Sequence, residues 1–167
     1  FRSNLITVLV VDNNSHPHET MSFEVQSERI AAVPGGAELL VQLINLSLDA
    51  PNESDFLATA LDLFRKTVNS KGVVLVRGVK GQWRIIANSG SDDSLPVELL
   101  SETLDSEKCQ QSEGWTAAPL FRPNSSGKLI ACDASVDPDI FDALTAAVGL
   151  ALIALERRFQ QQRRVDR

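Results

Sequence analysis

The sequence predicts an α+β domain built around an antiparallel sheet, and two observations lead to this fold class. Apolar residues recur at helical spacing near both ends of the chain. Between them lie short apolar runs in pairs, each pair joined by turn residues, as in β-hairpins. The 167 residues are 43% hydrophobic, which is enough apolar material to bury one core.

The N-terminal segment predicts strands. The run Leu5–Val11 is continuously aliphatic or β-branched, and a weaker strand over Met21–Gln26 pairs with it through a turn at His16–His18. The breaker Pro34-Gly35-Gly36 then marks a domain boundary. We therefore expect residues 1–33 to be a strand-rich leader, either the tail of a preceding domain, such as a forkhead-associated module, or an added sheet edge.

Two helices follow this boundary. The first carries leucines and an isoleucine at helical spacing from Leu39 to Leu48, and Ala50-Pro51 ends it. Asn52 is a suitable N-cap for the second, which presents an apolar face from Phe56 to Val68.

The rest of the chain predicts two hairpins, a short helix and a long helix. The first hairpin joins the strands Val73–Val76 and Trp83–Ala87, and Ser94 caps a short helix that runs to Leu104. The second hairpin joins Trp115–Phe121 to Leu129–Asp133, and a long helix begins near Asp139. The acidic residues at 137 and 139 are explained by capping of that helix.

The charge distribution argues against nucleic-acid binding by the globular part, and the length of the apolar stretches argues against a membrane span. The net charge is −6, and five of the sixteen basic residues are arginines within the last eleven positions, so the body is strongly acidic and repels phosphate backbones. The basic end is interpreted as a solvated helix terminus. The longest apolar stretch, Ala143–Leu155, is shorter than the roughly 20 residues that a membrane-spanning helix needs.

The sequence indicates no catalytic residue, metal site or cofactor motif. Cys109 and Cys132 form no CxxC pair, and neither has a histidine at zinc-ligand spacing. Both are interpreted as structural, reduced thiols, which favours a cytoplasmic location. The chain begins with Phe1 in place of methionine, so we expect it to be part of a longer polypeptide.

Four stretches together resemble a GAF domain, the small sensory module of signalling proteins, and a PAS or other small sensory fold is the alternative because no single stretch is diagnostic. They are DFLATALDLFRKTVNSKGVVLVRG (55–78), GQWRIIANSGSDDSLP (81–96), WTAAPLFRPNSSGKLIACDAS (115–135) and DPDIFDALTAAVGLALIALERR (137–158). The resemblance implies an α/β sandwich whose central antiparallel sheet carries the N- and C-terminal helices on one face. It places the GAF-like domain at residues 34–158, with 159–167 as a basic helical continuation toward an output module.

Departures from the family pattern reduce the range of ligands that we expect. The segment Asn88–Gly114, which would form the lid over a GAF pocket, is short. The chain has Cys132-Asp133-Ala134-Ser135 where cyclic-nucleotide-binding members have Asn-Lys, and Cys109 lacks the neighbouring histidine common at bilin attachment sites. We expect neither cyclic GMP nor a covalent chromophore.

Two groups of residues are candidates for function. The ligand-pocket candidates are Trp83, Ile85, Trp115 and Ala117, on strands expected to be neighbours, although the two tryptophans also fit a simple core. The dimer and signalling-helix candidates recur at helical spacing on the last helix: Leu144, Val148, Leu152, Leu155 and Phe159. We expect a homodimer through the terminal helices, or, as the alternative, packing of the last helix on Gly36–Leu48 within one chain.

The resulting interpretation is a non-catalytic sensory or regulatory domain of a cytoplasmic, bacterial signalling protein or transcription regulator. It would bind a small molecule or partner and transmit the change through its terminal helices to an output domain. Two alternatives stay open. One is a ligand-free dimerisation scaffold, and the other is a thiol-dependent enzyme similar to the GAF proteins that reduce free methionine sulfoxide.

Overall fold

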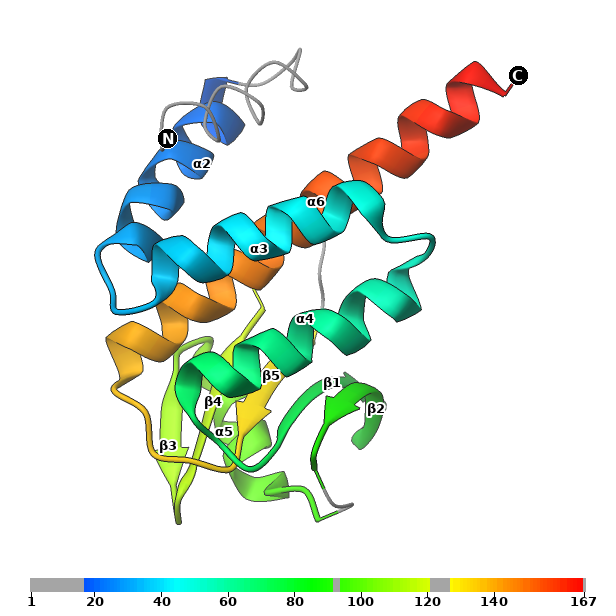
Figure 1. Ribbon diagram of the computed structural model, residues 1–167. Helices are drawn as coiled ribbons and strands as arrows, with labels where there is room; N and C mark the ends of the chain where they lie inside the picture. Colours follow the sequence, from blue (N-terminus) through cyan, green and yellow to red (C-terminus); the bar gives the residue numbers. More distant parts are fainter. Residues whose placement is uncertain (1–16, 92–93, 121–126, 167) are drawn as a thin grey trace.

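The structure is a computed structural model that describes residues 17–91, 94–120 and 127–166 (Figure 1). Helices open and close this part of the chain, with a sheet and one short helix between them. The helices are α2 (Pro17–Ala31), α3 (Gly36–Asp49), α4 (Glu53–Val68), α5 (Val97–Ser106) and α6 (Pro138–Val165). The strands are β1 (Val73–Val79), β2 (Gln82–Ser89), β3 (Gln110–Ser112), β4 (Trp115–Pro119) and β5 (Lys128–Cys132).

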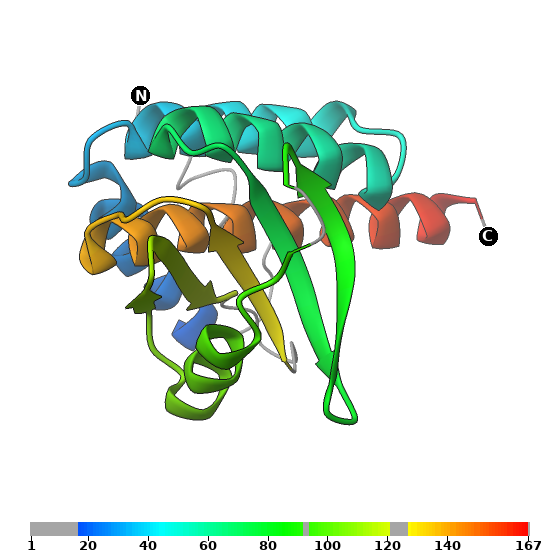
Figure 2. The same cartoon turned by 90° about the horizontal axis from the view of Figure 1, so that it is seen from below.

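The five strands form one antiparallel sheet in the order β2-β1-β5-β4-β3. Figure 2 shows the sheet lying between α3, α4 and α6 on one side and α5 on the other. The fold is therefore α+β with the terminal helices on one face, as predicted. The central position of β1 explains its unbroken apolar run Val73–Val76, because a strand covered on both faces has no solvent side.

The larger core lies on the helical face and is built from aromatic and aliphatic side chains. Phe56, Phe64 and Phe141 are all fully buried, and the rings of Phe64 and Phe141 meet edge to face with centroids 5.4 Å apart. Edge-to-face contact is a favoured geometry for two aromatic rings. This pair joins α4 to α6 across the middle of the core.

Several predicted boundaries are confirmed. Asn52 is the N-cap of α4, and its side chain accepts a hydrogen bond from the Asp55 backbone N–H at 2.8 Å. The Asp137 carboxylate accepts hydrogen bonds from the backbone N–H groups of Asp139 and Ile140 and so begins α6. The prediction for Ser94 was wrong, since α5 begins after Pro96, which occupies the N-cap position without a side-chain hydrogen bond.

The predicted strand Met21–Gln26 is also wrong, because Pro17–Ala31 is helical. The side chains of Phe23, Ser27 and Ile30 are buried, at the spacing of one helix face. Pro17 is the first residue of the helix, where its missing N–H costs nothing. The helix therefore excludes the predicted hairpin through His16–His18. The predicted strand Leu5–Val11 lies outside the described residues.

Helix α6 is long and apolar enough to cross a membrane by length and composition, with a mean hydropathy of 1.7 in its most apolar window. However, 67% of that window is buried inside the protein. It contacts α3 most extensively, and also α2, α4 and the sheet. These contacts identify α6 as a central core helix.

Candidate functional site

The four ligand-pocket candidates lie on one face of the sheet, the face covered by α5. Trp83, Ile85 and Trp115 are partly buried there and Ala117 is fully buried. They surround a small cluster whose buried members are Val74, Val76, Leu99, Leu100, Ala117, Leu129 and Ala131. The four candidates thus share a single face of the sheet, and their role as a ligand pocket stays a prediction.

The expectation that the two tryptophans belong to neighbouring strands is wrong. Trp83 lies on β2 and Trp115 on β4, and two strands, β1 and β5, separate them. Both hairpins formed as predicted, but β5 rather than β4 pairs with β1. Local hairpin signals do not specify which strand of one hairpin meets the other hairpin.

A β-bulge directs the side chains of β2. Leu75 pairs with Ala87 and Val76 pairs with Ile85, so Ile86 is an extra residue in the ladder. An extra residue reverses the alternation of side chains beyond it. As a result Trp83 and Ile85 face α5, whereas Ala87 packs against the helical core.

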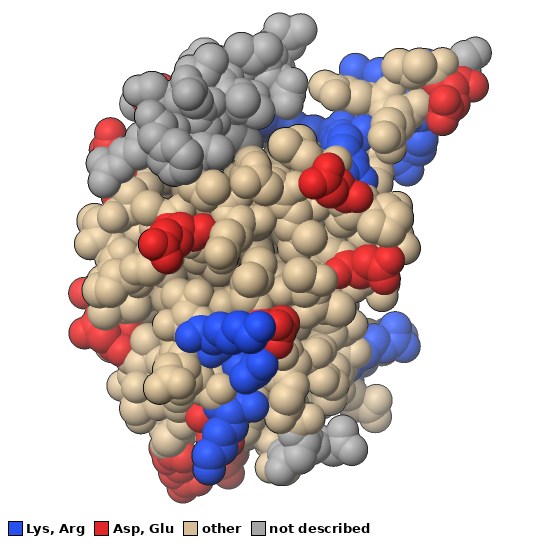
Figure 3. All heavy atoms as spheres, in the orientation of Figure 1, with Lys and Arg blue, Asp and Glu red and all other residues tan. Residues whose placement is uncertain are grey.

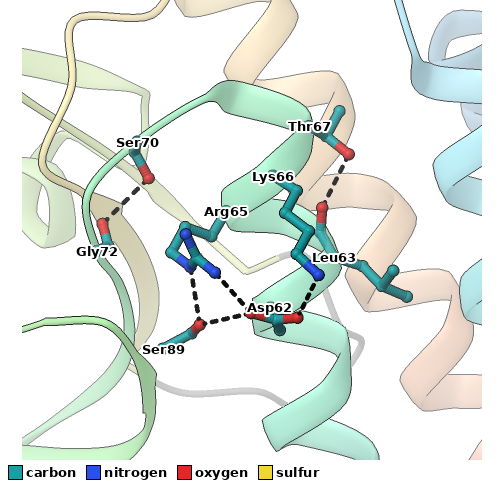
Figure 4. A network of polar contacts seen from close by, with 8 residues as sticks. All are labelled: Asp62, Leu63, Arg65, Lys66, Thr67, Ser70, Gly72 and Ser89. Carbon is teal, nitrogen blue, oxygen red and sulfur yellow. Dashed lines mark hydrogen bonds and ion pairs between the residues drawn. The ribbon is translucent and has the colours of Figure 1, made fainter.

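A polar network holds the end of β2 against α4 (Figure 4). Arg65 donates from Nε to Ser89 Oγ at 3.1 Å and from Nη2 to Asp62 Oδ1 at 2.8 Å. Lys66 Nζ lies 3.0 Å from the second carboxylate oxygen of Asp62. The hydrogen bonds from Arg65 and Lys66 lower the pKa of Asp62 to about 2. This network fixes the strand that presents Trp83 and Ile85.

The space between α5 and the sheet is largely filled by protein. Leu99 is 3% exposed and Leu100 is fully buried, and both project from α5 onto the sheet. What is left open is a groove of about 430 Å³ at the start of α5, bounded by residues 94–99, the β3–β4 turn and Trp115. Of the four candidates, only Trp115 lines this groove.

A second cavity, of about 370 Å³, lies between α2, α6 and the β4–β5 hairpin. Arg29 and Asp142 line it and form an ion pair across it, and Gln26 accepts a hydrogen bond from Arg29. Its lining mixes cationic and anionic side chains, so it presents no net charge to a ligand. Sequence reasoning did not indicate this cavity, because its walls come from segments far apart in the chain.

The two thiols are free, with Cys109 partly buried and Cys132 buried. Cys132 ends β5 and Cys109 precedes β3, with β4 between those two strands. Burial is the main cause that raises the pKa of each thiol to about 12.

A metal site would be formed by acidic, histidine and cysteine side chains. No group of three or more His, Cys, Asp or Glu side chains that could hold a metal ion occurs among the described residues. The predicted absence of a metal site stays a prediction for the whole chain.

The signalling-helix candidates are mostly interior residues. Leu144, Val148, Leu152 and Leu155 are each at most 1% exposed, inside the core that α6 shares with the other helices. Within this one chain they are covered, and α6 packs on α3, which is the contact that the alternative predicted. A homodimer through the terminal helices stays a prediction. Phe159 is partly buried at the edge of the same core.

Comparison with known proteins supports the fold. No protein-family model and no curated protein sequence matches the chain. Solved structures match it at low identity, and they are mostly GAF domains. The domain has a GAF-like fold.

Three of these structures illustrate the range of proteins that share this fold. The GAF domain of a phosphoenolpyruvate-protein phosphotransferase from Coxiella burnetii is 12% identical, with a TM-score of 0.55 over 75% of this chain and 95% of that one. Free methionine-R-sulfoxide reductase from Neisseria meningitidis is 13% identical, with a TM-score of 0.59 over 74% and 90%. A phycocyanobilin-bound GAF domain from a cyanobacterial phytochrome is 12% identical, with a TM-score of 0.53 over 74% and 95%.

Proposed function

We propose that this chain is a non-catalytic sensory or regulatory domain of a bacterial, cytoplasmic signalling protein or transcription regulator. In this proposal a small molecule or a partner binds the GAF-like domain and changes the setting of α6. The change then passes along α6 to an output domain in the same polypeptide. The role is conformational, because binding energy that differs between two settings of a helix is sufficient to shift their populations.

The observation that carries this proposal is the path of α6. The helix begins at Pro138, runs through the core, where Phe141 is fully buried, and ends at Val165, which is 84% exposed. Figure 1 shows its C-terminal turns extending away from the other elements. A continuous helix of this kind joins the packed interior directly to whatever follows the domain.

The α5 face supports a binding role. The groove beside Trp115 is open, and its lining combines apolar residues, such as Leu95 and Val97, with the carboxylates of Glu98 and Glu113. Ligand sites typically combine apolar walls with a few polar groups. We therefore place the proposed small-molecule ligand at this groove, next to the one pocket candidate that lines it.

Native mass spectrometry of freshly purified protein tests the ligand and the oligomeric state together. We expect an added mass on the wild-type protein that is lost from Trp115→Ala and retained in Trp83→Ala, since only Trp115 lines the groove. A homodimer, which we propose through the terminal helices, would appear in the same spectrum. Bare wild-type protein that no metabolite stabilises would favour the ligand-free scaffold instead.

The enzyme alternative is favoured by the similarity to free methionine sulfoxide reductases, and the thiols allow it to be tested. A nucleophilic cysteine must be a thiolate, and a pKa near 12 in place of 9.0 lowers the thiolate fraction at neutral pH about a thousandfold. We expect Cys109 in the folded protein to react with iodoacetamide at least about a hundredfold more slowly than in urea. Rapid alkylation of the folded protein, together with sulfoxide reduction that is lost in Cys109→Ser, would establish the enzyme.

A further inference from the structure

The C-terminus of α3 needs hydrogen-bond donors that its own sequence does not provide. Pro51 restricts Ala50 to an extended conformation, which the structure shows at φ −62° and ψ 132°, and the helix stops there. The Ala50 N–H bonds to the Leu46 carbonyl, but the carbonyls after Leu46 have no helical donor. The last turn of α3 also contains no basic residue.

Arg158 of α6 supplies the missing donors. Its Nη1 donates to the Ser47 carbonyl at 2.8 Å, and its Nη2 donates to the Ala50 carbonyl. Ser47 is fully buried, so this carbonyl has little access to water. The guanidinium also places a positive charge at the negative end of the α3 dipole, which is the favourable arrangement.

Arg157, the residue before Arg158, contacts α2. The guanidinium of Arg157 lies over the ring of Phe23 on α2, with its carbon 5.0 Å from the ring centroid. Phe23 is 4% exposed. Consecutive residues project about 100° apart around a helix, so one turn of α6 reaches α2 with Arg157 and α3 with Arg158.

We propose that Arg157 and Arg158 form a clamp that fixes the rotation and the axial position at which α6 leaves the domain. A change of one residue in the register of α6 would move the Arg158 fork away from the two carbonyls and Arg157 away from the Phe23 ring. Figure 3 shows lysine and arginine side chains gathered where α6 leaves the body. The role of the clamp in setting the position of an output helix rests on the proposed function. The contact that it makes between three helices does not depend on that function.

Hydrogen exchange on this chain without any ligand tests the clamp. In Arg158→Met both donors are lost while an unbranched, flexible apolar side chain is retained. We expect exchange of the Ala50 amide and of the α6 amides beyond Leu155 to accelerate about tenfold or more, since bonds from charged donors are among the stronger ones. The β1 amides, such as Val74, should change less than about twofold because β1 does not contact the clamp.

The matched control is Arg164→Met, which removes the same charge from an exposed position on the same helix. Equal exchange in Arg158→Met and Arg164→Met would overturn the clamp. Should Arg158→Met fail to fold, Phe23→Leu tests the other arm, because leucine keeps an apolar side chain but has no ring. We expect a smaller acceleration of the α6 amides beyond Leu155, about threefold, and unchanged exchange would again overturn the proposal.

The same experiment separates the clamp from the proposed function. The exchange measurement requires no ligand, so a wild-type protein that binds nothing leaves the expected Arg158→Met result in place and removes only the sensory role. Conversely, a ligand-binding protein whose α6 is unaffected by Arg158→Met retains the sensory role and loses the clamp.

Discussion

The two faces of the sheet are covered very differently. On the helical face, α3, α4 and α6 enclose the core in which Phe56, Phe64 and Phe141 are fully buried. On the other face a single ten-residue helix, α5, covers the same strands and leaves Trp83 and Trp115 only partly buried. Stability is therefore concentrated on one face, and the other can rearrange at lower cost.

This difference has a simple physical origin. Apolar burial contributes about 25 cal/mol per Å² removed from water, so a face covered by three helices contributes more than one covered by a short helix. Local openings involve the parts of a protein with the fewest buried contacts. A ligand that must displace or order side chains is thus expected on the α5 face, where the proposed groove lies.

The largest predicted effect tests the helical face. Phe141→Ala removes a fully buried ring that contacts Phe64 edge to face, and we expect the free energy of unfolding to fall by about 3–5 kcal/mol. Chemical denaturation followed by circular dichroism measures it. The matched substitution Trp83→Ala, on a partly exposed ring, should cost clearly less, about 1–2 kcal/mol. Equal losses would show that the two faces are equally important for stability.

An intermediate effect is expected in the order of unfolding. The chain contains two tryptophans and no tyrosine, and both tryptophans lie on the α5 face, so intrinsic fluorescence reports that face alone. Far-UV circular dichroism reports mainly the helices of the other face. We expect the urea midpoint from fluorescence to be lower by about 0.5 M, which corresponds to roughly 1 kcal/mol. Coincident transitions would mean that the domain unfolds as one unit.

The smallest predicted effect concerns the network that anchors β2. The pKa of Asp62 in the folded protein, about 2, lies below its ordinary value of 3.8. The stability that the ionised Asp62 carboxylate adds to the fold is therefore fully present above about pH 4 and is lost as the pH falls toward 2. Asp62→Asn should remove that acid dependence and lower Tm at neutral pH by no more than about 3 °C, since the pair is solvent-accessible. Glu102→Gln, an exposed carboxylate on α5, is the control. An unchanged acid dependence in Asp62→Asn would exclude this role.

Most elements after Gly35 could be predicted, because their signals are local. Asn52, Pro51 and Asp137 act on backbone groups within a few residues, and hairpin turns act within a few more. The short strand β3 was missed, since three polar residues carry no strand pattern. Helix α2 was misassigned because a window of six residues, Met21–Gln26, is too short to distinguish a period of 2 from a period of 3.6.

The candidate site was predictable only in part. Trp83, Ile85, Trp115 and Ala117 do lie on one face of the sheet, but the separation of the two tryptophans depends on which strands pair. Arg158 was interpreted as part of a solvated basic end. A helix that ends before Pro51 with no basic residue in its last turn was a signal that a donor comes from elsewhere, although nothing in the chain indicated which arginine.

The sequence by itself determined the α+β class, the amphipathic helices and the residues that share a face, because periodicity and capping depend on neighbours along the chain. Tertiary structure alone decided the order of the strands, the burial of Leu144 and Leu152 within one chain, and the contact of Arg158 with α3. These features join residues far apart in the chain, up to 111 positions for Arg158 and Ser47. They arise from the best packing of whole surfaces, which no local pattern encodes.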